Sequence, residues 1–108
     1  MSGDGWKTLS STATTCASLK ITTAGTYMLF ASMYVENSNT VDGTSIYIYA
    51  GSNLVKTIAT TLSGYQSLTL LVSYGITANT TVYLKASSSG GRAFISDARD
   101  GLYAVRVA

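Results

Sequence analysis

The sequence has no histidine, no proline and a single cysteine, Cys16, among its 108 residues. Without histidine, the chain lacks the usual general base, the Ser–His and Cys–His nucleophile pairs and most zinc ligand sets. One cysteine can form neither an internal disulfide nor a Cys-x-x-Cys site, so it leaves the redox compartment open. These absences argue against most hydrolases, and we interpret Cys16 as a small buried hydrophobic residue.

Charge is also scarce. Only 11% of residues are charged, and the 7 basic residues, which give a net charge of +2, are scattered along the chain. This pattern predicts no nucleic-acid surface and no anionic-membrane surface. No apolar run approaches the ~20 residues of a membrane span, so we expect no membrane insertion. Residues 1–5 are polar and lack the apolar segment of a signal peptide, so we interpret them as a polar tail.

Hydroxyl and aromatic side chains are abundant instead. The chain holds 15 Ser, 16 Thr and 8 Tyr, and 46% of its residues are hydrophobic. A chain this apolar can bury a core of its own, and its richness in Thr, Tyr, Val and Ile favours strands. We therefore expect one all-β domain over residues 1–108.

Alternation and turn residues divide the chain into eight strands with no helix. Gly51 and Ser52 form a two-residue hairpin turn between two of them. This spacing is typical of an antiparallel sandwich or barrel. The expected strands cover residues 6–10, 16–22, 26–36, 44–50, 53–60, 66–74, 80–87 and 101–108.

Some of these strands are apolar on both faces. In residues 26–36 one face carries Leu29 and Met33, while the other carries Met28, Phe30 and Tyr34. A strand of a monomeric sandwich should have one polar face, although tyrosine tolerates water and Phe30 could cap an edge. We favour coverage by another protomer, since an exposed stripe of this kind promotes aggregation. The predicted interface comprises Met28, Phe30, Tyr34, Tyr47, Tyr49 and Leu71.

If successive strands run up and down, the long loops gather at one end, which we interpret as a binding tip. These loops cover residues 11–15, 37–42, 61–65 and 88–100. The short turns and both termini then lie at the other end, the base, where Trp6 would be a core or anchoring residue.

Two segments carry a resemblance to a known superfamily. The run from Thr23 through Gly25, Thr26 and Tyr27 to Ser32, and the apolar closing strand from Leu102 to Val107, resemble the tumour-necrosis-factor and complement-globular-head jelly rolls. The Ser/Thr-rich composition, without proline or histidine, is similar to that of the jelly-roll heads of bacteriophage fibres, baseplates and capsid decorations. The resemblance implies a homotrimer of ten-stranded or slightly reduced jelly rolls packed about a three-fold axis. Together with the eight strands inferred above, we expect an eight-stranded antiparallel jelly-roll β-sandwich that assembles as a homotrimer.

Several tip residues could hold a sugar or a protein partner. Aromatic rings and arginine are frequent anchors at binding surfaces, and asparagine amides hydrogen-bond glycans. Tyr65 could equally be a strand-edge residue. The predicted ligand-binding residues are Tyr65, Arg92, Phe94, Asn37 and Asn39.

The carboxylates predict no chemistry of their own. Asp97 and Asp100 are expected to pair with Arg99 or Arg92, and Asp42 to lie in a turn. Their spacing matches no calcium loop and shows no glycosidase carboxylate pair. We therefore expect no enzyme activity, no metal site and no cofactor.

Together these inferences predict a non-enzymatic bacteriophage virion surface protein, made in the host cytoplasm. One version is a trimeric receptor-binding head at a tail fibre or baseplate tip, whose partners are other virion proteins and a host glycan or protein. The alternative is a capsid decoration protein that stabilises the phage head, which a chain without an anchoring stem would favour. A secreted bacterial ligand of the same superfamily is the third version, against which the missing signal and stem count.

Overall fold

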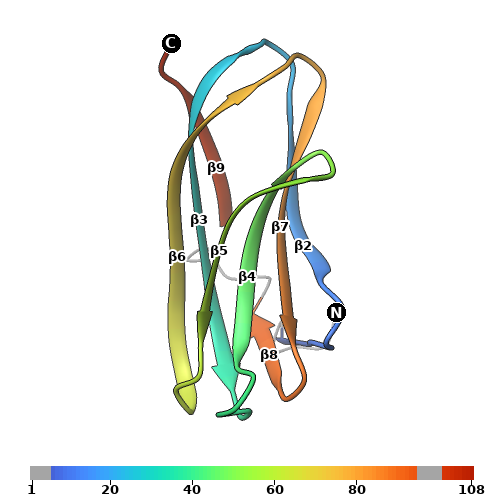
Figure 1. Cartoon of the computed structure of the whole chain (residues 1–108), viewed down its shortest axis with the longest axis vertical. Coiled ribbons are helices and arrows are strands. Elements are labelled where there is room, and N and C mark those ends of the chain that lie inside the picture. Colours follow the sequence, from blue (N-terminus) through green and yellow to red (C-terminus); the bar gives the residue numbers. More distant parts are fainter. Residues whose placement is uncertain (1–5, 95–100) are drawn as a thin grey trace.

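The computed structural model describes residues 6–94 and 101–108, and side chains over residues 8–92 and 101–108. Predictions that concern residues 1–5, Asp97, Arg99, Asp100 and the side chains of Trp6 and Phe94 fall outside the described residues. The described chain forms strands joined by short turns (Figure 1). The strands are β1 (Trp6–Thr8), β2 (Thr14–Ile21), β3 (Gly25–Asn37), β4 (Thr44–Ala50), β5 (Asn53–Thr60), β6 (Gly64–Ile76), β7 (Thr80–Ser88), β8 (Gly91–Phe94) and β9 (Gly101–Arg106).

Two antiparallel sheets face each other. Sheet A has the order β1-β8-β3-β6, and β9 also pairs with β3, while sheet B has the order β2-β7-β4-β5. β8 pairs with residues 34–37 of β3 and β9 with residues 27–32, so together they fill one position beside β3. The nine strands therefore occupy eight positions in the sandwich. The all-β expectation is confirmed, including the turn at Gly51, which has a φ of +61°.

The loop expected over residues 88–100 is wrong in part. Ser88 still belongs to β7, and Gly91–Phe94 form β8. The run of serines and glycines before β8 predicts a loop because it has no apolar alternation. The backbone of β8 is nevertheless hydrogen-bonded as a strand, since β1 lies on one side of it and β3 on the other. Long-range pairing decides this segment rather than its own side chains.

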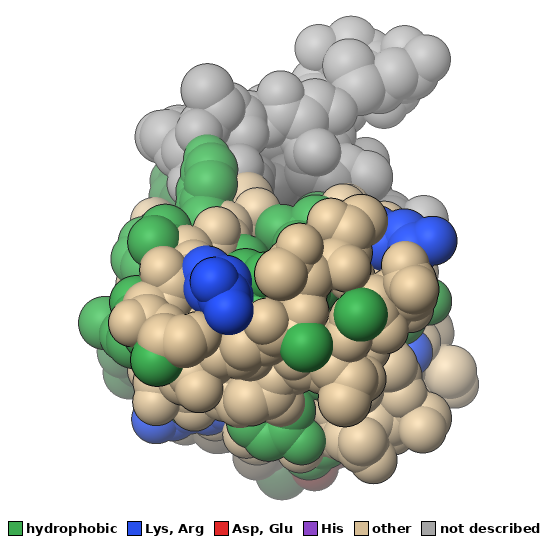
Figure 2. Space-filling view, turned by 90° about the horizontal axis from the view of Figure 1, so that it is seen from above, with side chains coloured by type: hydrophobic (Ala, Val, Ile, Leu, Met, Phe, Trp, Pro, Cys, Tyr) green, Lys and Arg blue, Asp and Glu red, His purple; other side chains and the backbone are tan. Residues whose placement is uncertain are grey.

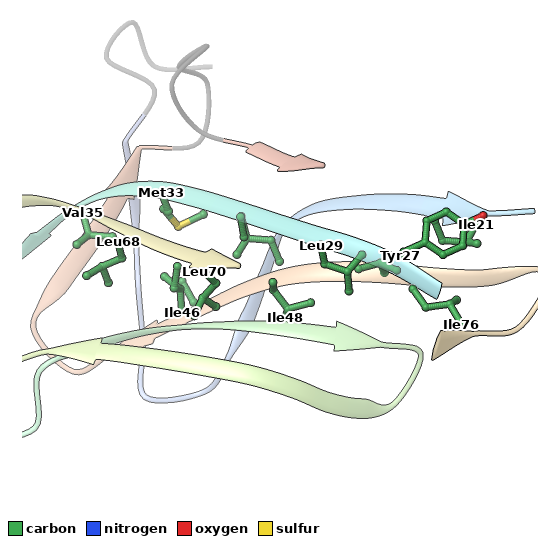
Figure 3. Close-up of a cluster of buried hydrophobic side chains, with 14 of the residues drawn as sticks. Ile21, Tyr27, Leu29, Met33, Val35, Ile46, Ile48, Leu68, Leu70 and Ile76 are labelled. Carbon is green, nitrogen blue, oxygen red and sulfur yellow. The ribbon is translucent and has the colours of Figure 1, made fainter. Parts of the chain in front are cut away.

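The core lies between the sheets and follows the alternation of the strands. Leu29 on β3, Ile48 on β4 and Leu84 on β7 are completely inaccessible to water. Figure 3 shows inward side chains of this core along the length of the sandwich, with Met33 and Leu68 toward one end and Ile21 and Ile76 toward the other. Burial of this kind is the dominant stabilising term in a small sandwich.

The connections separate into two ends. Segments 9–13, 38–43, 61–63 and 89–90 lie at one end, the loop end, and segments 22–24, 51–52 and 77–79 at the other, the turn end (Figure 1). The C-terminus lies at the turn end, where the Val107 N–H donates to the Thr26 carbonyl at 2.8 Å. β1, the first strand, lies beside the loop end instead, because it pairs with β8 there. The prediction that both termini share the base is therefore wrong for the first strand.

Seen from the turn end, the described surface consists mainly of backbone and uncharged polar side chains, with hydrophobic side chains at several places (Figure 2). Lys and Arg side chains are visible at separate places and do not gather into one patch. In the described residues no helix is long and apolar enough to span a bilayer.

Candidate functional site

The outer face of sheet A carries an exposed apolar patch. Phe30 on β3 lies opposite Leu71 on β6 and opposite Tyr103 on β9. One step along the ladder, Met28 lies opposite Val105. Leu71 is 55% exposed, Tyr103 52% and Val105 63%. These five side chains, the apolar patch, cover three adjacent strands and bring together three of the predicted interface residues.

A polar row borders this patch toward the loop end. Glu36 on β3 lies between Tyr65 on β6 and Arg92 on β8, and the Arg92 Nε donates to the Glu36 Oε1 at 2.6 Å. The hydrogen bond to Glu36 is the main cause that raises the pKa of Arg92 above its usual value, and a bond to Tyr65 adds to it. The Tyr65 ring also stacks on Tyr34, with centroids 6.0 Å apart. Two of the predicted ligand-binding residues, Tyr65 and Arg92, therefore lie on either side of Glu36, which was not among the predicted site residues.

Tyr47 and Tyr49 belong to a different surface. Both lie on β4 in sheet B, where each is half-buried on the outer face. Met28, Phe30, Tyr34 and Leu71 lie on the outer face of sheet A. The predicted interface therefore cannot be one continuous face of a single sandwich. Alternation identifies residues that point away from the core, but it does not say on which sheet they lie.

Asn37, predicted as a ligand-binding residue, is the last residue of β3 and is buried, with 1% of its surface exposed. Its Nδ2 donates to the Leu62 carbonyl at 3.0 Å and to the Asn39 carbonyl at 3.1 Å. Its Oδ1 accepts the Thr44 hydroxyl at 2.9 Å, and the Thr44 Oγ1 lies 2.9 Å from the Ser88 Oγ. Buried polar groups need such partners. This buried network joins β3, β4 and β7 to the loops at the loop end.

Asn39 organises its own loop. Its Oδ1 accepts the N–H groups of Val41 at 3.0 Å and Asp42 at 2.9 Å, and its Nδ2 donates to the Ser89 Oγ at 2.5 Å. Asparagine commonly stabilises turns in this way. Arg92 and Phe94 lie on β8, so they are strand residues and not the tip of a loop.

Two depressions lie at opposite ends of the sandwich. The pocket at the loop end has a volume of about 280 Å³, and the one at the turn end about 300 Å³. The turn-end pocket is lined by residues 50–53, 74–77 and 80, among which Tyr74 is the one aromatic residue. The loop-end pocket is richer in chemistry, and sequence reasoning missed most of it because the serine run was interpreted only as loop. It is lined by Ser11, Asp42, Gly43, Ser45, Tyr47, Ser87, Ser88 and Ser89.

Hydroxyl donors and acceptors dominate the loop-end pocket. Each serine or tyrosine hydroxyl can donate one hydrogen bond and accept others, and the Asp42 carboxylate accepts only. Tyr47 Oη and Ser87 Oγ lie 2.7 Å apart within the pocket wall. Over the part of the chain with described positions, no group of three His, Cys, Asp or Glu side chains is placed to hold a metal ion. The arrangement is suited to hydrogen-bonding a polar ligand.

Comparison with known proteins shows the fold but assigns the chain to no family. No protein-family model matches the sequence, and a search of curated proteins finds no significant match. Among solved structures, the chain is similar to Eiger TNF from S. frugiperda, with a TM-score of 0.68 and 10% identity over 85% of this chain and 65% of that one. It therefore spans just under two thirds of that structure.

Two further solved structures match this chain with lower TM-scores. A family 35 carbohydrate-binding module from an environmental isolate matches with a TM-score of 0.48 and 18% identity, covering 96% of this chain and 88% of that one. The C-terminal CBM6 of LamC, a marine laminarinase from Zobellia galactanivorans, matches with a TM-score of 0.44 and 16% identity, over 76% and 65% of the two chains. At these identities the likeness concerns the fold alone. The chain has a jelly-roll β-sandwich fold similar to that of the Eiger TNF structure.

Proposed function

We propose that this chain is a non-catalytic binding module of a bacteriophage virion surface, which assembles as a homotrimer through sheet A and binds the host with its loop end. The observation that carries the proposal is the apolar patch, because soluble monomers seldom expose such a continuous surface. The proposed occupant of the patch is a second copy of the same chain.

The border of the patch supports assembly. Protein interfaces place apolar side chains at the centre and polar, partly hydrated groups at the rim. Phe30 and Leu71 would form such a centre, and the Arg92–Glu36 pair with Tyr65 would form a rim toward the loop end. Three copies are what the resemblance to tumour-necrosis-factor jelly rolls implies.

The residue inventory supports a binding role over catalysis. The chain contains no histidine, and the Glu36 carboxylate is paired with Arg92. The loop end is held by the Asn37 network and by the 2.8 Å bond from the Ser38 N–H to the Gly90 carbonyl. A pre-organised surface of this kind loses little conformational entropy on binding. The proposed location on a virion is inferred from the Ser/Thr-rich composition of the sequence.

The test compares labelled wild-type protein with Phe30→Asp in binding to a panel of bacterial cells. An assembled module should bind at least one strain, and the dissociated variant should bind it roughly a hundredfold more weakly because avidity is lost. The matched variant Ser52→Asp, at the exposed turn between β4 and β5 at the turn end, should bind like the wild type. Binding to phage capsids and to no cell would support capsid decoration and overturn the receptor-binding version.

A further inference from the structure

Three tyrosines and one lysine form a strip on the outer face of sheet B. Tyr49 on β4 lies opposite Tyr83 on β7, and Tyr47 lies opposite Lys85. The Tyr47 and Tyr49 ring centroids are 6.2 Å apart. All four side chains are half-buried, so each presents part of its surface to water. We call these four residues the tyrosine strip.

The Lys85 ammonium contacts two of the tyrosine rings in the strip. Its Nζ lies 4.6 Å from the centroid of the Tyr49 ring and 5.4 Å from that of Tyr83. A cation over two aromatic faces is attracted by both quadrupoles, so the two rings are tied to one side chain. The rings are thereby ordered before a ligand arrives, which reduces the entropic cost of binding.

The strip runs directly into the loop-end pocket. Tyr47 belongs to both, and the Ser45–Ser87 pair is the next step of the same ladder toward the loop end. Asp42 and Ser89 line the same pocket. One continuous surface thus offers hydroxyls and a carboxylate at one end and aromatic rings at the other.

We propose that this surface binds a neutral oligosaccharide. A sugar ring presents hydroxyls at its edge, which the serines, Tyr47 and the Asp42 carboxylate can pair with, and C–H groups on its face, which suit the negative face of a tyrosine ring. Within the pocket, Asp42 disfavours an acidic sugar, because the two anions would repel each other, while the Lys85 ammonium lies against the Tyr49 and Tyr83 rings. One sugar would occupy the pocket, and following sugars would lie along the tyrosine strip.

The inference rests on the binding role proposed above but not on assembly, since the apolar patch lies on the opposite sheet. It also differs from the sequence-based prediction, whose ligand residues Tyr65 and Arg92 lie on sheet A. The test therefore needs a tyrosine variant on each sheet.

The experiment screens purified protein on an array of neutral, sialylated and sulfated oligosaccharides, and then titrates the best neutral one by calorimetry. The double variant Tyr49→Ser/Tyr83→Ser should weaken the per-site affinity about tenfold or more, as expected for the loss of two ring contacts. Asp42→Asn should weaken it as well. Tyr65→Ser should leave it unchanged. Circular dichroism and sedimentation confirm that each variant keeps its fold and assembly.

Binding to acidic glycans alone, to no glycan, or with unchanged affinity in the double variant would overturn the inference. Phe30→Asp, titrated alongside, should keep the wild-type affinity per site, and a per-site loss there would overturn it too. A wild-type protein that is monomeric yet binds a neutral glycan through these tyrosines would remove the assembly proposal and leave this inference standing.

Discussion

Phe30 and Tyr103 lie side by side on the outer face of sheet A, with ring centroids 6.1 Å apart, and both are exposed to water in the single chain. Aromatic pairs of this geometry are usually buried, because their large surfaces contribute most when they leave water. The pair forms the centre of the apolar patch. The proposal that the chain self-assembles through sheet A depends on this exposed pair.

Replacing Phe30 with Asp should dissociate the assembly. A charge in the centre of an apolar interface leaves an uncompensated buried ion, which costs on the order of several kcal/mol. Size-exclusion chromatography with light scattering measures the mass directly. Leu54→Asp, which places the same charge on an exposed position of sheet B, should leave the mass unchanged; an unchanged mass for Phe30→Asp would place the interface elsewhere.

Replacing Thr44 with Val should destabilise the fold without changing side-chain volume. The change removes the hydroxyl that lies 2.9 Å from both Asn37 Oδ1 and Ser88 Oγ in a buried network. Leaving buried polar groups without partners should lower the free energy of unfolding by about 1–3 kcal/mol, measured by urea denaturation. The same substitution at exposed Thr15 should change it by less than ~0.5 kcal/mol. Equal effects at both positions would contradict the role of the network.

Replacing Gly91 with Ala should be costly because the backbone approaches its neighbours too closely for a side chain. A Cβ there would lie 2.7 Å from the Ser88 Oγ and from the Thr44 Oγ1, and 2.8 Å from the Glu36 carbonyl oxygen. Overpacking of this kind should lower stability by about 1–3 kcal/mol in thermal or urea unfolding. Gly75→Ala is the control, since a Cβ at Gly75 meets no atom within 4 Å. A neutral Gly91→Ala would show that β8 is more loosely packed than described.

The Arg92–Glu36 pair should contribute little to the stability of an isolated chain. The two side chains are 36% and 32% exposed, so water screens their attraction. A double-mutant cycle with Arg92→Gln and Glu36→Gln, on the monomeric Phe30→Asp background, should give only a small coupling, and that coupling should shrink as salt is added. A larger coupling that resists salt would mean that the pair is desolvated within the monomer.

Much of the fold could be predicted from local pattern. The strand over residues 44–50, the turn at Gly51 and the two-faced character of β3 all follow from alternation and turn residues. β8 could not, because its strand pairing comes from Tyr34–Asn37, more than fifty residues earlier in the chain. The order of the strands within each sheet likewise could not be predicted from the local sequence pattern.

The candidate site was harder to predict than the fold. Asn37 looks like a loop ligand in sequence, yet Thr44 and Leu62, contributed by later segments, bury and satisfy it. Tyr47 and Tyr49 point away from the core as expected, but their sheet depends on pairing with β7. The pocket of serines arises only when segments near Ser11, Asp42 and Ser88 meet at the loop end.

Sedimentation equilibrium of the wild-type chain tests the central claim of self-assembly most directly. At micromolar concentration and physiological salt, we expect a single species of about three times the 11.3 kDa chain mass, which the Phe30→Asp substitution converts to a monomer. A soluble wild-type monomer that stays at 11.3 kDa over the whole concentration range would contradict it.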